Sequence, residues 1–437
     1  MNIVIFAPGL KASAIGRMTG LLVRELSAQG HTVVLIRSEE KVLLSAVPQS
    51  FSVEVIDWLQ TSAVDAACAQ ADAIVHQIGD NYHYHYGSLE WLSKYPSVVC
   101  LHDFYLGNLF FQWAQTHMAE AEQALLHWYG AGSNKKFFEY SHRQDFIELT
   151  CAAMPMTEWL CAMASAVITH SSWGIKRVLD SCAGPVRAVP LAYEVPAWDG
   201  ESAVSNAEAH ADGEPFNILT IGNVNANKRA ASVIRALAQS EKLRRSAVFR
   251  LVGQCDTLKA LELSALARNL GVNLVISGPV DDDVLAVIVR GADVVSCLRW
   301  PSLEAASASA IEAMLHCKPV VVTNVGFYRE IPSDHVVHID PDNEIDSLCK
   351  ALEWLHAEPE ARLALGRRAQ AWASQQFTAA GYCRALLGVV DDMHMAAPIL
   401  HSMRFFAQAL SDWKTDTRWL GTSLALDPIR SLLGTTA

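Results

Sequence analysis

The sequence predicts an α/β protein made of two doubly wound domains in tandem, followed by a helical C-terminal tail. Its 437 residues are too many for one ordinary core and suit two domains of about 150–200 residues each. Short runs rich in Val and Ile alternate with amphipathic helical stretches, as expected for parallel sheets covered by helices. The alternation stops in a polar stretch and then restarts. We therefore place one domain at 1–200, a second at 201–380 and a helical extension at 381–437.

The first half of the chain carries the predicted strands of the first sheet. In order they are NIVIF, TVVLI, AIVHQI, SVVCLHD, AVITHS and VRAVPLA, with a helical segment around 15–29 after the first. Residues 104–165 predict a long helical insertion. Its aromatic residues have the spacing of core positions, although they are also candidates for contact with a lipid-linked acceptor or a membrane surface: Phe110, Phe111, Trp113, Trp128 and Tyr129. Residues 194–215 are small, polar and aperiodic, which predicts a linker between domains.

The second half repeats the pattern. Its strand-like runs are FNILTIGNV, AVFRLVG, VNLVISG, ADVVSCL, PVVVTN and VVHID, with helices near 228–240 and 257–270. After about residue 343 the chain is nearly all helical, and its segment RFFAQALSDW is amphipathic. For that segment we favour a helix packed on the body over a membrane or partner helix. Sheets of this kind bind ligands at the carboxyl ends of their strands, so two facing sheets predict a central cleft.

Composition excludes several classes of protein. The net charge of −12 argues against nucleic acid as the main partner and against general docking on anionic lipid. No apolar run reaches the roughly 18 residues needed to span a bilayer, and the N-terminus has no basic lead of a signal peptide. The ten cysteines are scattered singly, which favours reduced thiols in a cytoplasmic protein over a disulfide framework or a zinc site.

The segment SLEAASASAIEAM, residues 302–314, holds two glutamates with small residues between them. On one continuous helix, positions eight apart differ by about 80° in direction, so the two would not point together. The difficulty disappears if Glu304 lies in a loop, a helix starts near Ser307, and Glu312 lies on that helix. The free N–H groups at the helix start would then favour an anion, and small side chains would let a phosphate approach. An alanine-rich surface helix is the equal alternative.

The segment TIGNVNANKRA places two cations after a predicted strand. The strand ends at Gly222, and a loop carries Lys228 and Arg229 to the next helix. Adjacent cations at a strand's carboxyl end are well placed to meet a diphosphate. A solvated helix start is the alternative, but basic residues there oppose the helix dipole.

The first domain offers weaker signals. The loop after its first strand carries Gly9 and Gly16 without the GxGxxG pattern of a dinucleotide site. His83 and His85 have no carboxylate or cysteine at a typical ligand spacing beside them, so we predict no metal site. His102 follows a buried strand and is the histidine best placed to reach across the cleft, although a structural hydrogen-bonding role is equally common for such a residue.

These motifs together resemble glycosyltransferase family 4, the retaining GT-B transferases, over residues 1 to about 380. The resemblance is strongest at 216–332, where the loop IGNVNANKR is followed by the Glu-x7-Glu signature and then by AM, CKP and VVVT. In the first domain, SAIGRMTGLLVREL is similar to the family's first loop and helix, and VITHSSWGIKRVL to its VxxHS strand end. The family fold is two Rossmann-like domains facing a cleft.

The resemblance implies a role for each motif residue. It implies that Lys228 and Arg229 neutralise the diphosphate of a nucleotide sugar, that Glu304 binds hydroxyls of the sugar, and that Glu312 binds the ribose. Further implied contacts are backbone N–H groups around Ala308 and Ser309 for a phosphate, the Gly222–Asn223 turn and Gly16 for close approach, His102 beside the sugar ring, and Asn81 and His83 on the acceptor side. Two departures stand out: Asn223 replaces a common arginine, and Ala305–Ala306 lacks the family's glycine.

The implied reaction moves a hexosyl group from a nucleoside-diphosphate sugar to an acceptor hydroxyl, with retention and without a metal or other cofactor. The implied acceptor is a saccharide, glycolipid or other glycoconjugate, in the cytoplasm or at the inner face of the membrane, in bacterial surface polysaccharide synthesis. Three rivals stay open: a sugar-nucleotide epimerase of the same architecture, a dehydrogenase, and a degenerate transferase that serves as a scaffold.

Overall fold

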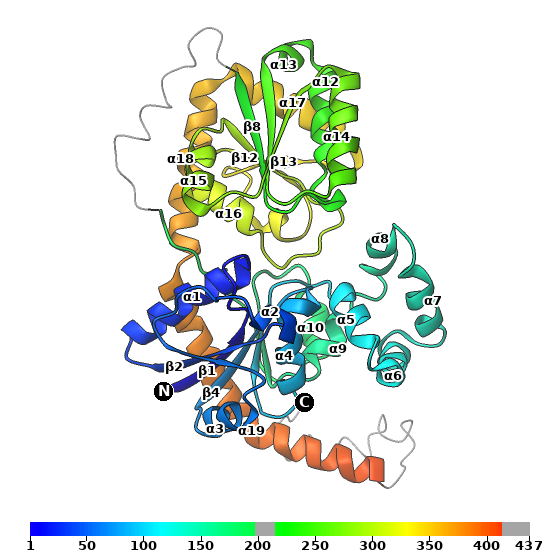
Figure 1. The fold of residues 1–437 in the computed structure, drawn as a ribbon, viewed down its shortest axis with the longest axis vertical. Coiled ribbons are helices and arrows are strands. Elements are labelled where there is room, and N and C mark those ends of the chain that lie inside the picture. The colour runs from blue at the N-terminus through cyan, green and yellow to red at the C-terminus, as the bar shows by residue number, and fades with distance from the viewer. Residues whose placement is uncertain (197–214, 413–437) are drawn as a thin grey trace, which may run out of the picture.

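The structure of the chain is a computed structural model, which describes residues 1–196 and 215–412. Two α/β domains lie one above the other, with the second domain at the top of Figure 1. Most of the linker predicted at 194–215, namely residues 197–214, lies outside the described residues, as do residues 413–437. The predicted domain boundary at 200/201 therefore cannot be placed on the fold.

The first domain is built on a parallel sheet with the strand order β3-β2-β1-β4-β5-β6-β7 in the described chain. Its strands are β1 (Asn2–Ala7), β2 (Thr32–Arg37), β3 (Glu54–Asp57), β4 (Ala73–Ile78), β5 (Val98–Leu101), β6 (Ala166–Thr169) and β7 (Val186–Ala188). Helices cover both faces, which explains why most of the strands are continuous apolar runs. The sequence did not predict β3, because this short edge strand buries only one of its four residues.

The helices of the first domain include the predicted insertion. They are α1 (Ala14–Ala28), α2 (Lys41–Leu44), α3 (Thr61–Ala69), α4 (Tyr82–Trp91), α5 (Gly107–Ala114), α6 (Met118–Tyr129), α7 (Ser133–Tyr140), α8 (Phe146–Thr150), α9 (Thr157–Cys161) and α10 (Ile175–Leu179). Helices α6 to α8 project to the side of the domain in Figure 1. The aromatics of this insertion share one buried cluster with residues of β4, β5 and β6: Phe110, Phe137 and Phe146 are buried in it, and Phe111, Trp113, Trp128 and Tyr129 are partly buried against it.

The second domain is built on a parallel sheet with the order β10-β9-β8-β11-β12-β13. Its strands are β8 (Phe216–Ile221), β9 (Ala247–Val252), β10 (Asn273–Gly278), β11 (Val294–Cys297), β12 (Val320–Thr323) and β13 (Val337–Ile339). The strand order reverses between β8 and β11, so the loops after these two neighbouring strands diverge and leave a crevice between them. The loops with Lys228 and with Glu304 are these two loops.

The described helices of the second domain surround its sheet, and two of them bear on the cleft. They are η1 (Ala226–Lys228), α12 (Ala230–Gln239), α13 (Glu241–Ser246), α14 (Thr257–Leu270), α15 (Asp282–Arg290), α16 (Ala308–Leu315), η2 (Gly326–Glu330), η3 (Pro341–Asn343), α17 (Glu344–Ala357) and α18 (Pro359–Gln376). Helix α16 points its first turn toward the first domain, and η1 carries Lys228.

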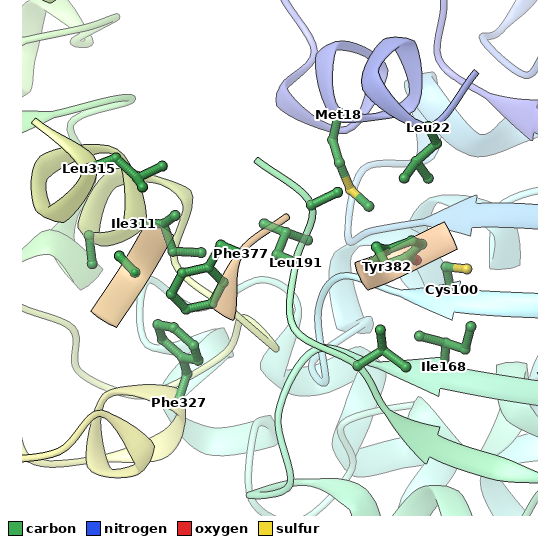
Figure 2. Close-up of a cluster of buried hydrophobic side chains, with 14 of the residues drawn as sticks. Met18, Leu22, Cys100, Ile168, Leu191, Ile311, Leu315, Phe327, Phe377 and Tyr382 are labelled. Carbon is green, nitrogen blue, oxygen red and sulfur yellow. The ribbon is translucent and has the colours of Figure 1, made fainter. Parts of the chain in front are cut away.

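An apolar seam fixes α16 between the two domains (Figure 2). Ile311 and Leu315, on the inner face of α16, belong to one buried cluster with Phe327 and Phe377 of the second domain. The same cluster continues into the first domain, where its members include Met18, Leu22, Cys100, Ile168 and Leu191, and it also contains Tyr382 of the C-terminal helix. Because cores are close-packed, this seam sets the position of α16 relative to the first sheet.

The C-terminal helix α19 (Ala379–Asp412) leaves the second domain and packs along the first (Figure 1). Its residues Tyr382, Leu386 and Val389 are buried against α1 and the sheet. The expectation of a packed helix is wrong at its far end, where Phe405 and Phe406 are 67% and 49% exposed. No surface of the described chain covers these two side chains.

Candidate active site

A cleft of about 490 Å³ lies between the domains, at the carboxyl ends of both sheets. Both predicted glutamates line it, although they are eight positions apart in the sequence. Its walls come from α1, from the loop after β5, from the segment after β7 and from the 304–312 segment: Ala14, Ile15, Arg17, Met18, Leu21, Arg24, Gln49, His102, Asp103, Leu191, Ala192, Tyr193, Glu194, Asp282, Glu304, Ala306, Ala308 and Glu312. A volume of this size is typical of small-molecule sites.

Glu304 lies in the loop before α16, as its position in the sequence predicted. Its carboxylate oxygen Oε1 accepts a hydrogen bond from the Tyr328 hydroxyl at 2.7 Å and lies 3.1 Å from Nε of Arg299. Burial is the main cause that raises the pKa of Tyr328 well above its ordinary value, so this hydroxyl is a hydrogen-bond donor throughout the neutral range. Two fixed donors therefore hold the Glu304 carboxylate at the edge of the cleft.

The backbone around Glu304 is held by the first domain. The amide of Phe104 donates to the carbonyl of Leu303 at 2.8 Å, and the amide of Ala305 donates to the carbonyl of His102 at 2.8 Å. These bonds form a short antiparallel bridge between Asp103 and Glu304. Glu304 is thus positioned by both domains together.

Helix α16 begins immediately after Ser307, as predicted. The Ser307 hydroxyl caps the helix by accepting from the amide of Ala310 at 3.4 Å. The amides of Ala308 and Ser309 belong to the first turn, where backbone N–H groups have no partner inside the helix. Glu312 lies on the next turn and lines the cleft, and its carboxylate accepts from the Tyr193 hydroxyl at 3.2 Å.

Lys228 is buried at the end of η1, with 8% of its surface exposed. Its ammonium donates to the backbone carbonyl of Ile221, the last residue of β8. Burial, assisted by the nearby charge of Arg299, lowers the pKa of Lys228 to about 7, and Glu304 opposes that shift. Gly222 has a φ of +88°, and a Cβ there would lie 2.5 Å from the Lys228 ammonium, so only glycine fits this turn without strain.

Arg229 and Asn223 lie beside this turn, and like Lys228 they are not among the residues that line the cleft. Nε of Arg229 is 3.1 Å from both carboxylate oxygens of Glu344, the first residue of α17. Nη2 of the same guanidinium is 3.0 Å from Oε1 of Glu344. To meet a ligand in the cleft, Arg229 would have to leave this pair. Asn223 is exposed.

The first domain contributes two neighbouring ionisable residues to the cleft. Nε2 of His102 bonds Oε1 of Gln77 at 2.8 Å, and its ring lies 4.5 Å from that of His170. Burial and the neighbouring histidines lower the pKa of His102 well below its ordinary value, so this imidazole is neutral at pH 7. Asp103 accepts from the amide of Asp80 at 2.8 Å, and its pKa is raised to about 7 by burial and by Glu304.

The remaining predicted residues have local structural partners. Gly16 lies in the first turn of α1, where a Cβ would be 2.5 Å from the carbonyl oxygen of Pro8. Asn81 caps α4 by accepting from the amide of His83 at 3.1 Å, and the His83 ring lies 2.7 Å from Oε2 of Glu40. Neither Asn81 nor His83 lines the cleft described above.

Sequence reasoning missed Arg299, Tyr328, Asp103 and Tyr193. Arg299 stands two residues after β11 and Asp103 two residues after β5, so strand-end position alone could have indicated both. Tyr328 and Tyr193 reach the two glutamates from segments far away in the sequence. No local pattern indicates those two.

Within residues 1–196 and 215–412, no group of three or more His, Cys, Asp or Glu side chains could hold a metal ion. Among the helices of the same ranges, none combines the length and the apolar character needed to cross a membrane.

Part of the chain matches a known protein family. Residues 204–372 match the family model for glycosyl transferases group 1. A search of curated protein sequences returned no match.

Solved structures match nearly the whole chain. The HepE protein of Anabaena in complex with UDP is 17% identical at a TM-score of 0.58, with 92% of this chain and 100% of that chain covered. Sucrose-phosphate synthase from Thermosynechococcus elongatus is 16% identical at 0.62, covering 92% and 99%. WaaG, a glycosyltransferase involved in lipopolysaccharide biosynthesis, is 17% identical at 0.57, covering 88% and 98%. At such identities the likeness establishes architecture, and this chain has the two-domain GT-B fold that the sequence predicted.

Proposed function

We propose that this protein is a retaining glycosyltransferase of family 4, which moves a hexosyl group from a nucleoside-diphosphate sugar to an acceptor hydroxyl. The observation that carries the proposal is that Lys228 and Glu304, from the loops after β8 and β11, lie close enough to interact electrostatically, with the first turn of α16 directly after Glu304. These strands flank the point where the strand order reverses, which is the usual place for a nucleotide on such sheets. The family match over 204–372 covers all of these residues.

The diphosphate would lie against the first turn of α16. Its charge increases as the bond to the sugar breaks, so its stabilisation is the main electrostatic task of the enzyme. The free amides around Ala308 and Ser309 and the ammonium of Lys228 supply positive potential there. Arg229 adds to it only in a state where it leaves Glu344. Because these groups can balance the diphosphate, we propose that no metal is needed.

Glu304 would accept hydrogen bonds from hydroxyls of the donor sugar, with Tyr328 and Arg299 holding it still. Glu312 would accept hydrogen bonds from the ribose hydroxyls. In the structure its carboxylate accepts one from the Tyr193 hydroxyl instead. His102, neutral and oriented by Gln77, would lie beside the sugar ring. We propose the acceptor side for Asn81 and His83, and close approach of the donor for Gly16, Gly222 and Asn223.

Retention requires that the acceptor attack the face from which the diphosphate leaves. We propose that the departing phosphate takes the acceptor proton, as the resemblance to retaining transferases implies. Closed domains would exclude water during this step. Proton NMR of the first product formed gives its anomeric configuration, and an inverted product would contradict this part of the proposal.

The biological setting is a finer proposal. UDP is bound by the Anabaena protein and WaaG acts in lipopolysaccharide biosynthesis, so UDP-sugars are the first donors to test, and surface polysaccharide or glycolipid synthesis the first setting. We place the reaction in the cytoplasm, at the inner face of the membrane where the acceptor is lipid-linked.

The experiment is a screen of the purified protein against UDP-, GDP- and dTDP-sugars for hydrolysis and for transfer to added saccharides. At least one donor should be consumed by the wild type. Glu304→Ala and the double variant Lys228→Ala/Arg229→Ala should lose that activity while their unfolding temperatures show a folded protein. Normal transfer by the double variant would contradict the proposal that these two cations stabilise the diphosphate.

One observation keeps an epimerase as the second candidate. His102, Asp103 and Glu304 lie on the same part of the cleft wall, and an epimerase needs acids and bases crowded around the sugar. An assay with donor and no acceptor separates the two functions. An epimerase converts the sugar nucleotide to its isomer, whereas a transferase leaves it intact or hydrolyses it slowly.

A further inference from the structure

Arg299 is a buried cation that the roles described above leave without a ligand of its own. It follows β11, and only 5% of its surface is exposed. Its Nε lies 3.1 Å from the Glu304 carboxylate, and its Nη2 donates to the Ser309 hydroxyl at 3.4 Å. Its Nη1 donates to the carbonyl of Leu298 at 2.8 Å. The guanidinium therefore extends from the sugar-side acid to the first turn of α16.

The charges in this cluster do not balance. Arg299 and Lys228 lie close enough for each to disfavour the charge of the other, and Glu304 is the carboxylate that faces both. The thiol of Cys297 and the phenol of Tyr328 stay neutral, since burial raises the pKa of each. Burial opposes the charge of Arg299, but Glu304 outweighs burial and the pKa of Arg299 is raised. The cost of two cations beside one carboxylate therefore falls on Lys228, whose pKa is lowered to about 7, and an anion beside both cations would relieve it.

Arg229 is the other candidate for a second cation at the diphosphate, but its charge is already paired with a carboxylate. Its guanidinium forms three contacts of 3.0 to 3.1 Å with the Glu344 carboxylate, and Glu344 is 7% exposed. No such dedicated carboxylate exists for Arg299 in the described chain, because Glu304 also binds Tyr328 and faces the cleft. Neither arginine is among the residues that line the cleft, but Arg299 already contacts the first turn of α16 through the Ser309 hydroxyl.

We propose that Arg299 is the second cation of the diphosphate site, and that it binds a phosphate oxygen beside Ser309 while its Nε keeps Glu304 in place. This inference rests on the proposed function, because it concerns the donor of that reaction. A planar guanidinium suits the task, since its fork can bind a carboxylate on one edge and a phosphate on the other.

The test compares four proteins by titration calorimetry: wild type, Arg299→Gln, Arg229→Gln and Arg362→Gln. Arg362 is the matched control because it is 6% exposed in the same domain and bound to Asp293 at 3.2 Å, away from the cleft. The probes are UDP, GDP, uridine, guanosine and inorganic pyrophosphate. Pyrophosphate carries no sugar, so a residue that acts only by positioning Glu304 would not alter its affinity.

We expect Arg299→Gln to weaken pyrophosphate and the preferred nucleoside diphosphate at least tenfold and to leave the nucleoside within twofold. Arg362→Gln should stay within threefold of wild type for every probe, and Arg229→Gln should lose less affinity for pyrophosphate than Arg299→Gln. An unchanged pyrophosphate affinity in Arg299→Gln, or a larger loss in Arg229→Gln than in Arg299→Gln, would overturn the proposal. If the wild type binds none of these diphosphates, the proposed function itself fails, which is a different result.

A second measurement needs no variant and covers the case in which Arg299→Gln does not fold. A crystal of the wild-type protein soaked with the preferred nucleoside diphosphate should show a phosphate oxygen within about 3 Å of an Arg299 Nη atom. A phosphate held by Arg229, with Arg299 still bound only to Glu304 and Ser309, would refute the assignment.

Discussion

Donor binding should take up a proton, because Lys228 is only partly charged in the empty protein. Its pKa is lowered to about 7 by burial, with a contribution from Arg299. A diphosphate beside the ammonium would favour the charged form and raise that pKa again. Above pH 7 the ligand must therefore bind together with a proton, and affinity must fall as the pH rises. Below pH 7 Lys228 is already charged, and this dependence disappears.

The magnitude follows from the titration of one group. With a pKa of about 7, Lys228 is charged in roughly nine tenths of the empty molecules at pH 6 and in roughly one tenth at pH 8. The affinity for a nucleotide sugar should therefore fall about tenfold between these values, with uptake of about 0.1 proton per ligand at pH 6 and about 0.9 at pH 8. A nucleotide sugar is the right ligand, because its diphosphate has no terminal phosphate to titrate near pH 6.

The assay is calorimetry at each pH in two buffers that differ in ionisation enthalpy, since the difference in measured heat counts the protons exchanged. Lys228→Met is the control variant and should abolish most of the uptake. Asp103 also has a pKa raised to about 7, so the dependence that survives in Lys228→Met is assigned to that carboxyl. Equal affinity at pH 6 and pH 8 with no proton uptake in the wild type would refute the reasoning.

Three substitutions test the rest of the cleft. Glu304→Gln keeps the shape of the side chain but removes its charge; we expect kcat/KM to fall at least 100-fold, a loss typical of one transition-state hydrogen bond, while circular dichroism stays native. Tyr193→Phe frees Glu312 of its hydroxyl partner, so nucleoside affinity by calorimetry should tighten about threefold to tenfold, and a weaker affinity would show that the hydroxyl assists binding. Gly222→Ala forces φ +88° on alanine and crowds the Lys228 ammonium, so it should destabilise the protein by about 1–2 kcal/mol in denaturant titration and weaken the donor, whereas wild-type values for both would contradict this geometry.

The order of strands along the chain could be predicted because the buried strands of a parallel sheet are nearly continuous apolar runs. Every run named from the sequence became a strand. Among the strands of the described chain only β3 was missed, because this edge strand buries one of its four residues. The start of α16 could also be predicted, since a serine before an alanine-rich run is a strong helix cap. One apolar pattern misled by contrast: the segment with Phe405 and Phe406 is amphipathic, but both side chains are largely exposed in the described chain.

The site could be predicted only as far as it follows strand ends. Glu304, Glu312 and His102 line one cleft because each belongs to a segment that begins where a parallel strand stops. The direction of a long side chain could not be predicted in this way, because it depends on partners that are remote in the sequence. Lys228 and Arg229 are adjacent, yet one ammonium turns to the end of β8 and the other guanidinium turns to Glu344 on α17.

Under the proposed function, recognition of the donor sugar would depend on the contact between the two domains. Glu304 has its carboxylate fixed by the second domain, but its backbone segment is hydrogen-bonded to the first, through the amide of Phe104 and the carbonyl of His102. The indole of Trp173 and the hydroxyl of Ser171 add bonds to the carbonyls of Glu304 and Ala305, and the apolar seam joins the same two domains. Each such hydrogen bond contributes about 0.5–1.5 kcal/mol net. A movement of the first domain would therefore displace the acid that we propose to bind the donor sugar.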